Sequence, residues 1–367
     1  MSRTVKSRTL AVSALLTMGL LAATAPAHAQ SSHQPALDTQ LEYFNLHPKA
    51  DGMFNLVPLR PLTEVRGQQG LVTLQNGIDV LQGPDGNVTV QVGPDGVVVI
   101  DSQRREHGDA LVAALKQVAG GRPIRFFFTT NGDDDRGGAA QIVRKSGQAI
   151  FGGNMAAQAA DLANEAVHMA HENVLARLAG VNGDAAADDT LWPKETYAGD
   201  EYDFHLNDEG VQFFHLPAAH TDGDSIVFFR RSDVIVAGDL WDTTAYPKID
   251  TAHGGSIQGL LDGLNKIIEL TIPGNKQEGG TLVVPGRGRP GDESEVVEYR
   301  DMVTIIRDRI RDMSASGMTL AQVKSARPTF DYDGRYGSTE GQWTTEAFIT
   351  AIYNGVNSKK QRGKTAQ

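Results

Sequence analysis

The sequence predicts an α/β protein made of two mixed β-sheets with helices on their outer faces. Short apolar runs typical of strands are followed by segments with helical periodicity, and this order occurs twice along the chain. Each half opens with strands and closes with a helix that has one apolar face. Two successive halves of this kind indicate a sandwich of two sheets.

The first 29 residues have the pattern of a secretory signal peptide. A basic start precedes an apolar run over residues 10–25, which is too short and too interrupted to span a membrane. Ala27 to Ala29 then form a small-x-small cleavage signal. Cleavage after Ala29 predicts a mature protein in the periplasm or outside the cell, with no membrane anchor. Residues 30–70 are expected to form an N-terminal extension.

The charge and the lack of cysteine exclude several classes of protein. The predicted signal peptide holds three basic and no acidic residues, so the rest of the chain has 31 basic and 45 acidic residues, a net charge of −14. An acidic chain of this kind is not expected to bind nucleic acid, whose phosphates select basic surfaces. The chain has no cysteine, so it has neither disulfides nor thiolate metal ligands.

The first half of the domain begins near Leu71 with four strand-like runs, LVTLQ, IDVLQ, VTVQV and VVVID. Two Gly-Pro-Asp-Gly sequences, at 83–86 and 93–96, predict tight turns between them. A helical period follows over 110–118, a strand over 124–128, and a second helix after Gly138.

The second half repeats this order after a connecting region. Residues 154–178 are rich in alanine and predict a helix, and 180–197 predict a polar connection. Strands are expected at 201–206, 211–216, 226–230, 234–239 and 281–285. Ser256 caps one predicted helix, and Asp292 with Glu295 begins a longer one in the manner of a capping box. Residues 317–367 are expected to form a small helical appendage.

Polar loops follow several of the predicted strands. The densest is TTNGDDDRGG, at 129–138. Each of its charged groups alone is explained by ordinary turn or cap chemistry. Functional groups nevertheless concentrate on loops at one end of a rigid sheet framework, so the loops together predict one site. Its candidate residues are Asn131, Asp133, Asp135, Arg136, His220, Asp239 and Arg287.

Together with their flanking segments, these loops make the sequence resemble the metallo-β-lactamase superfamily from about Leu71 to beyond Asp312. The matching segments are GNVTVQVGPDGVVVID, FFFTT, AHENVLARL, PAAHTDGDSIVFFR, VAGDL, YPKID with GGSI, and VVPGRG before a helix containing YRDM. The resemblance implies an αβ/βα four-layer sandwich over residues 71–316, with the active site along one edge shared by the two sheets. It also implies that the nearest relatives are exported, hydrolase-like proteins.

The chain departs from the metal-binding pattern of that superfamily. The family's first metal loop is His-x-His-x-Asp-His, and its places are taken here by Asn131, Asp133, Asp135 and Arg136. The third-strand histidine matches His220 and the bridging carboxylate matches Asp239, whereas Arg287 replaces the last histidine. A guanidinium stays protonated and has no lone pair for a metal. Arg136 and Arg287 would therefore repel an ion from the second metal position.

Two arrangements of the site stay open. In one, Asn131, Asp133, His220 and Asp239 hold a single divalent ion, which is zinc, manganese, magnesium or calcium. In the other there is no metal, and three aspartates, at positions 133, 135 and 239, pair with the two arginines. His107 and His253 would add ligands only if their loops turned inward.

The expected function follows from the resemblance and from the altered centre. The leading hypothesis is a periplasmic hydrolase of a small ester, lactone or amide, with at most one metal ion. Asp135 would orient the attacking water, and Arg136 or Arg287 would hold the oxyanion. The competing hypothesis is a non-hydrolytic protein that binds an anionic small molecule in an arginine-edged cleft. A β-lactamase is disfavoured because its chemistry depends on the missing histidines.

Overall fold

The structure is a computed structural model that describes residues 70–149, 164–181, 183–277 and 279–365, and the backbone of two short strands. These strands, β1 (Phe44–Pro48) and β2 (Phe54–Pro58), pair antiparallel. The chain divides into two units, of which the second, residues 42–367, holds everything described. The predicted signal peptide and most of the predicted extension lie outside the described residues.

The first large sheet has seven strands in sequence order. They are β3 (Gly70–Thr73), β4 (Ile78–Gly83), β5 (Gly86–Gly93), β6 (Gly96–Ile100), β7 (Ile124–Phe128), β8 (Val167–His171) and β9 (Glu195–Tyr197). Neighbours from β3 to β6 are antiparallel, and those from β6 to β9 are parallel. Gly83 pairs with Gly86 and Gly93 with Gly96, so both Gly-Pro-Asp-Gly sequences form the predicted tight turns.

The second large sheet has five strands, also in sequence order. They are β10 (Glu201–Leu206), β11 (Glu209–Leu216), β12 (Asp224–Phe229), β13 (Val234–Asp242) and β14 (Leu282–Arg287). All neighbours are antiparallel except β13 and β14, which are parallel because α8 (Ile257–Leu270) lies in the connection between them.

The other helices follow or connect these strands. They are α3 (Gly108–Ala119), α4 (Asp134–Gly137), α5 (Ala140–Lys145), α7 (Glu172–Leu178), α9 (Glu293–Ala315), α10 (Leu320–Ser325), α11 (Phe330–Tyr336) and α12 (Thr345–Thr365). Short 3₁₀ turns are η1 (Gln75–Gly77), η2 (Arg105–His107), η4 (Asp189–Leu191) and η5 (Thr251–His253).

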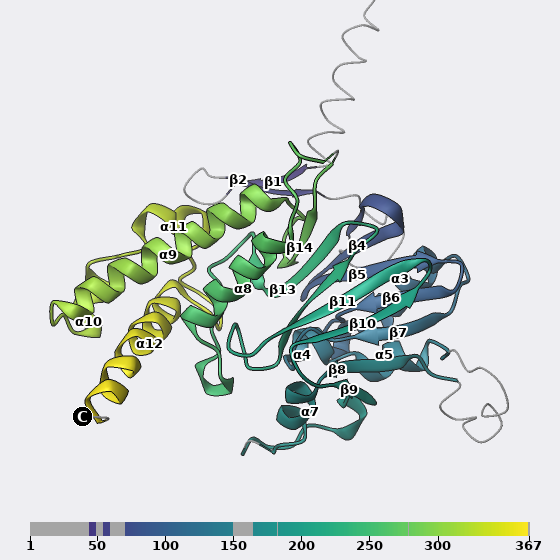
Figure 1. Cartoon of the computed structure of the whole chain (residues 1–367), viewed down its shortest axis with the longest axis horizontal. Helices are drawn as coiled ribbons and strands as arrows, with labels where there is room; N and C mark the ends of the chain where they lie inside the picture. Colours follow the sequence, from purple (N-terminus) through teal and green to yellow (C-terminus); the bar gives the residue numbers. More distant parts are fainter. Residues whose placement is uncertain are drawn as a thin grey trace, which may run out of the picture. The chain divides into compact units, whose positions relative to one another are not determined.

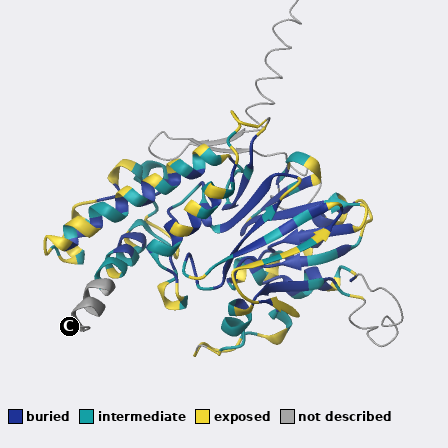
Figure 2. Cartoon of the chain, viewed as in Figure 1, coloured by how far each residue is buried: buried dark blue, intermediate teal, exposed yellow. Residues whose placement is uncertain are grey.

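Three hydrophobic cores hold these layers together, and Figure 2 shows the buried residues concentrated in the strands. The alternation along β6 assigns each side chain to a face. Val98 and Ile100 enter the core between the two sheets, and Val97 and Val99 enter the core under α3 and α5. A third core joins the second sheet to α8 and α9. The layers therefore run helix, sheet, sheet, helix (Figure 1).

The prediction for the connecting region misses two strands within the described residues, namely β8 and β9, the latter at the end of the predicted polar connection over 180–197. The helix expected over 154–178 is a strand, β8, at Val167–His171, and only α7 at Glu172–Leu178 is helical; residues 154–163 lie outside the described residues. β8 pairs with β7 on one side and β9 on the other. Its Met169 and Ala170 are buried. Burial and pairing on both sides outweigh the local helical preference of the alanine-rich sequence.

The structure confirms the two predicted N-cap residues, Ser256 and Asp292, but not the predicted capping box. The Ser256 hydroxyl accepts a hydrogen bond from the Gly259 amide at the start of α8, at 3.0 Å. Asp292 accepts from the amides of Ser294 and Glu295 at the start of α9. The Glu295 carboxylate does not close the capping box, because it binds the guanidinium of Arg289 instead.

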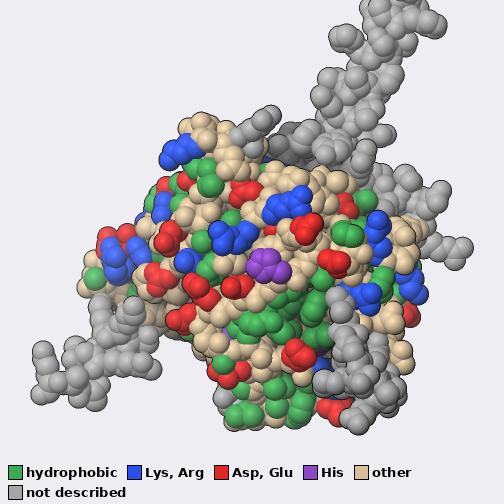
Figure 3. Space-filling view, turned by 45° about the vertical axis from the view of Figure 1, so that its right-hand side comes forward, with side chains coloured by type: hydrophobic (Ala, Val, Ile, Leu, Met, Phe, Trp, Pro, Cys, Tyr) green, Lys and Arg blue, Asp and Glu red, His purple; other side chains and the backbone are tan. Residues whose placement is uncertain are grey.

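The C-terminal helices α10 to α12 pack onto the rest of the domain. Phe348, Ile349 and Ile352 of α12 and Val323 of α10 are buried in the same core as the apolar faces of α8 and α9. Within the described residues, no helix is long and apolar enough to cross a membrane. Figure 3 shows one face of the molecule, on which basic, acidic and hydrophobic side chains are interspersed.

Candidate functional site

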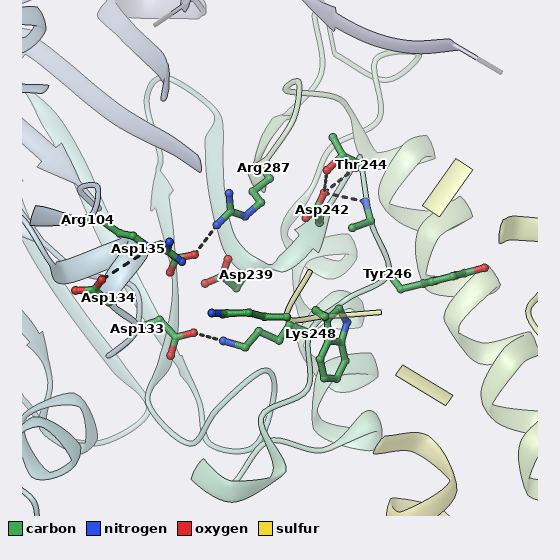
Figure 4. Close-up of a pocket in the computed structure, with 13 residues that line it drawn as sticks. Arg104, Asp133, Asp134, Asp135, Asp239, Asp242, Thr244, Tyr246, Lys248 and Arg287 are labelled. Carbon is green, nitrogen blue, oxygen red and sulfur yellow. Dashed lines mark hydrogen bonds and ion pairs between the residues drawn. The ribbon is translucent and has the colours of Figure 1, made fainter. Parts of the chain in front are cut away.

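A cavity of about 440 Å³ lies where the loops after β6, β7, β13 and β14 meet the loop before α12. Charged side chains dominate its wall, and Figure 4 shows them pointing toward one another from both sheets. The lining includes Asp133, Asp135, Asp239, Lys248, Arg287 and, from the C-terminal region, Trp343.

Asp101, at the end of β6, fixes the loop that carries the predicted metal motif. Its carboxylate accepts hydrogen bonds from the amide and the hydroxyl of Thr130, at 2.7 and 2.9 Å. Asp101 is buried and has a φ of 65°, a conformation that costs free energy for any residue other than glycine. Burial raises the pKa of Asp101 to about 7 despite the nearby Arg136.

Asp133 and Asn131 follow directly after β7. The Asn131 side chain accepts a hydrogen bond from the Asp133 amide at 2.9 Å and donates one to Asp239 at 2.8 Å. Asp133 precedes α4 but its carboxylate caps no amide of that helix. The carboxylate therefore remains available to the cleft, where it meets three cationic groups.

Two of those groups, Lys248 and Arg177, were not predicted from the sequence. The Lys248 ammonium donates a hydrogen bond to Asp133 Oδ2 at 2.5 Å, and Arg177 Nη2 lies 2.9 Å from Asp133 Oδ1. Lys248 belongs to the YPKID segment and Arg177 to AHENVLARL, so both lie in motifs that the resemblance rests on. A basic residue in a loop or a helix has no local pattern that shows it will face a cleft.

The third group is His220, which is fully buried. Its Nδ1 lies 3.3 Å from Asp224 Oδ1, and its Nε2 lies 3.6 Å from Asp133 Oδ2. Burial acts to lower the pKa of His220, but the surrounding carboxylates, Asp224 first, outweigh it and raise the value to about 9. The imidazole is therefore protonated at neutral pH.

Asp239 lies on β13 at a point where the pairing with β14 becomes irregular, between Gly238 and Asp242. Such bulges redirect a side chain, and here the Asp239 carboxylate turns toward the first sheet. Its Oδ2 accepts from Arg136 Nε at 3.0 Å, and Arg136 Nη2 binds Oδ1. Burial favours the neutral acid, but Arg136 outweighs it and holds the pKa of Asp239 well below its ordinary value.

Arg136 has no surface to offer a ligand, because its side chain is 0% exposed. Gly86 makes room for it. A Cβ at that position would lie 2.3 Å from Arg136 Nη1, and Gly86 has a φ of 139°. Arg136 is therefore a buried counter-ion of Asp239, behind the cavity wall.

Arg287, at the end of β14, faces the cavity. Its Nη2 donates to Asp135 Oδ2 at 2.5 Å, and its side chain is 35% exposed. The pair belongs to both sheets, since Asp135 lies on α4 after β7. Arg287 and Asp135 thus form one more carboxylate–cation pair along the edge that the two sheets share.

The structure brings the seven predicted residues to one place, in two roles. Four of them line the cavity, namely Asp133, Asp135, Asp239 and Arg287, whereas Asn131, Arg136 and His220 are buried behind its wall. The two additional histidines bind other carboxylates. His107 Nδ1 lies 2.5 Å from Asp85, and His253 Nδ1 lies 2.6 Å from Asp250.

The described residues contain one cluster with ligand types for a divalent ion. Asp133, His220 and Asp239 offer atoms within 4.8 Å of one another. Both oxygens of Asp239 are engaged by Arg136, and Asp133 is engaged by Lys248. An ion would have to displace the Lys248 ammonium from Asp133 and take Asp239 from Arg136, so these residues as arranged do not fit a resident metal.

The comparisons with known proteins concern the fold. No family model matches the sequence, and no curated protein matches it. Among solved structures, the chain is similar to the inverting sec-alkylsulfatase Pisa1 from Pseudomonas sp., with 14% identity and a TM-score of 0.55 over 84% of this chain and 56% of that chain. The chain has the metallo-β-lactamase fold.

Two metallo-β-lactamases are also similar to the chain. One is from Pontibacter korlensis, with 16% identity, a TM-score of 0.48 and coverage of 65% of this chain and 99% of that chain. The other is DIM-1, with 13% identity, a TM-score of 0.46 and coverage of 65% and 97%. The arrangement of the described strands and helices confirms the predicted fold class, two mixed sheets flanked by helices in a metallo-β-lactamase-like sandwich. The chain spans little more than half of the alkylsulfatase.

Proposed function

We propose that this metallo-β-lactamase-fold protein binds a small organic anion in the cleft, and that fixed cations take the role of a metal ion there. The observation that carries the proposal is the unused donor capacity of Arg287 and Lys248. Within the described residues, each donates one side-chain hydrogen bond, although a guanidinium has five N–H groups and an ammonium has three. Both side chains are partly exposed to the cavity.

Unpartnered polar atoms around the cavity support a polar ligand. Two buried atoms of residues that line the cavity, Asp135 Oδ1 and Trp343 Nε1, find no hydrogen-bond partner among the described residues. Such atoms are costly unless a ligand or water satisfies them. Their concentration at one cavity favours a bound molecule with several polar atoms.

Two aromatic residues of the lining support an apolar part of the same ligand. Trp343 and Tyr246 line the cavity together with the charged residues, and Trp343 also packs against the core under α9. A volume of about 440 Å³ suits a small organic molecule. We therefore expect an amphiphilic anion, with its charged group at Arg287 and Lys248.

The first compounds to test are suggested by the similar alkylsulfatase, whose substrates are alkyl sulfates by its name. We would titrate the mature protein calorimetrically with hexyl sulfate, hexyl phosphate and hexanoate, and with 1-hexanol as the neutral control. At least one anion should bind more tightly than hexanol. Arg287→Gln should weaken that binding about tenfold or more, whereas Arg311→Gln, an exposed arginine on α9, should have no effect. Equal binding of hexanol and the anions would contradict the proposal.

A second candidate is the hydrolase of a small ester, lactone or amide. The Asp133, His220 and Asp239 cluster favours it, since these are ligand types of a one-ion site. A divalent ion would be held by those three residues only if it displaced the Lys248 ammonium from Asp133, and it would then supply Lewis acidity. Asp135, on the adjoining loop, would orient the attacking water and Arg287 would hold the oxyanion. Hydrolysis of an ester and lactone panel that requires added zinc or manganese, and that Asp133→Asn abolishes, would favour this candidate over the first.

We also propose that the protein is exported and acts in the periplasm or outside the cell. The support is the signal-peptide pattern that ends at Ala29. N-terminal sequencing of the protein recovered from the periplasm or the medium should give Gln30 as the first residue. A retained Met1 on all of the protein would contradict this.

A further inference from the structure

We propose that the Lys248 side chain is a built-in counter-ion that closes a latent divalent-metal site formed by Asp133, His220 and Asp239. This goes beyond the proposed binding of an anion, because it concerns what the same fold would bind without one lysine. It explains why a metallo-β-lactamase fold can retain three ligand-type residues in one cluster and still leave no place for a metal.

The first support is the position of the ammonium. Asp133, His220 and Asp239 offer ligand atoms within 4.8 Å of one another, and Lys248 Nζ lies 2.5 Å from Asp133 Oδ2 at this cluster. Figure 4 shows the lysine reaching from its loop to Asp133, with Asp239 beside it. An ammonium in contact with a carboxylate excludes a divalent cation from the same oxygen, because the two like charges repel at that distance.

The second support is that the lysine is held in place. The Lys248 loop is attached at both ends. The Tyr246 hydroxyl donates to Thr329 O at 3.1 Å, and the Asp250 amide donates to His220 O at 2.8 Å. A surface lysine usually moves among many conformations. The backbone next to Lys248 is instead restrained by its hydrogen bond to the backbone of His220.

The third support is the orientation of His220. Its Nδ1 faces Asp224, and its Nε2 faces Asp133 while having no hydrogen-bond partner among the described residues. A histidine that binds a carboxylate through one ring nitrogen and presents the other is arranged as metal-ligating histidines are. The cluster therefore keeps the ligand types of a metal site, although Asp239 is shared with Arg136, and the Lys248 ammonium is the cation that occupies its Asp133 side.

The test compares zinc binding by four forms of the mature protein after chelator treatment and removal of the chelator. They are the unmutated protein, Lys248→Met, Lys248→Arg and the double variant Lys248→Met with Asp133→Asn. Methionine keeps most of the length of the side chain but removes its charge, and arginine keeps the charge. Lys324→Met is a matched control, since Lys324 also pairs with a carboxylate, Glu346 at 3.0 Å, but on α10.

Calorimetric titration should show that Lys248→Met binds one zinc ion at least about tenfold more tightly than the unmutated protein. Lys248→Arg and Lys324→Met should behave like the unmutated protein, and the double variant should lose the gain. Circular dichroism checks the fold, and Lys248→Gln replaces the methionine variant if that does not fold.

Two results would overturn the inference. One is a neutral variant at position 248 that binds zinc no better than the unmutated protein. The other is a gain that survives Asp133→Asn, which would place the ion elsewhere. Neither result bears on anion binding, which is measured separately through Arg287, so the two proposals fail independently.

Discussion

At the scale of single residues, the site is organised by matching each carboxylate with a cation. Asp239 has Arg136, Asp135 has Arg287, and Asp133 has Lys248 with Arg177. Charges this close to the interior are tolerated only when they are paired and hydrogen-bonded. Removing one member of the most buried pair should therefore cost far more than removing one member of an exposed pair.

Arg136→Met is expected to destabilise the protein by about 3–5 kcal/mol, because it leaves Asp239 ionised and unpaired beneath the cavity wall. Arg287→Met is the matched control. It removes an arginine from a similar pair that is partly exposed, and should cost about 1 kcal/mol or less. Urea unfolding of both variants measures the difference. Equal losses of stability would show that Arg136 is not the main counter-ion of Asp239.

The raised pKa of His220 predicts a loss of stability in mild alkali. Its pKa is 6.5 in the unfolded chain and about 9 in the folded protein, so the folded state binds more protons between these values. The stabilisation is fully present below about pH 6.5 and is lost as the pH rises through 9, by about 3 kcal/mol. Urea unfolding at several pH values across this range should show the decline, and His220→Gln should flatten it. An unchanged slope in that variant would assign the decline to other groups.

The sequence was sufficient to find Asp133, Asp135, Asp239 and Arg287, because each lies in a polar segment at or just after the end of a strand. It was not sufficient to find Lys248, Arg177 or Trp343. Lys248 and Trp343 line the cavity through the path of a long loop and the packing of the C-terminal helices, and Arg177 reaches Asp133 from α7. None of these is visible as a pattern in neighbouring residues.

At the scale of elements, α8 holds the His220 loop by close backbone contact. A Cβ at Gly259 would lie 1.9 Å from Ala218 O. Gly259→Ala should therefore destabilise the protein by about 1–3 kcal/mol, although alanine normally favours a helix. Gly355→Ala in α12 is the control, since its Cβ would meet Ile257 at an ordinary 3.7 Å, and it should stabilise by about 0.5–1 kcal/mol.

Thermal or urea unfolding of these two alanine variants gives the sign directly. If both changes stabilise the protein, α8 is free to move away from the His220 loop, and the helix does not position that histidine. If both destabilise it, the control fails and the comparison says nothing specific about α8.

The loop between α11 and α12 contributes Trp343 to the cavity wall, so the C-terminal region takes part in the proposed site. Trp343→Ala should weaken binding of the tightest anion of the hexyl series about tenfold, because it removes the apolar wall. Trp343→Phe keeps a ring and removes only the indole N–H, and should lose less. Calorimetric titration measures both variants, with the melting temperature as a check on folding. Unchanged affinity in the alanine variant would exclude this wall from the site.

At the scale of the whole molecule, the layered fold follows from two periodicities. Residues of β6 alternate between two cores, and α8 and α9 each bury one face. These signals are local, so the sequence predicted the two mixed sheets and most of their strands. β8 was missed because its identity depends on pairing with β7 and β9, which are distant in sequence. The predicted domain boundaries and the extension at 30–70 stay predictions.

We propose that amino-acid side chains supply the cations of the site on this fold. The most direct test is the metal content of the protein, measured by elemental analysis after purification without chelators from cells supplied with zinc and manganese. We predict well under one divalent ion per chain, and no change in the binding of the hexyl anions after treatment with a chelator. One or more tightly bound ions per chain, lost together with ligand binding on chelation, would contradict the account.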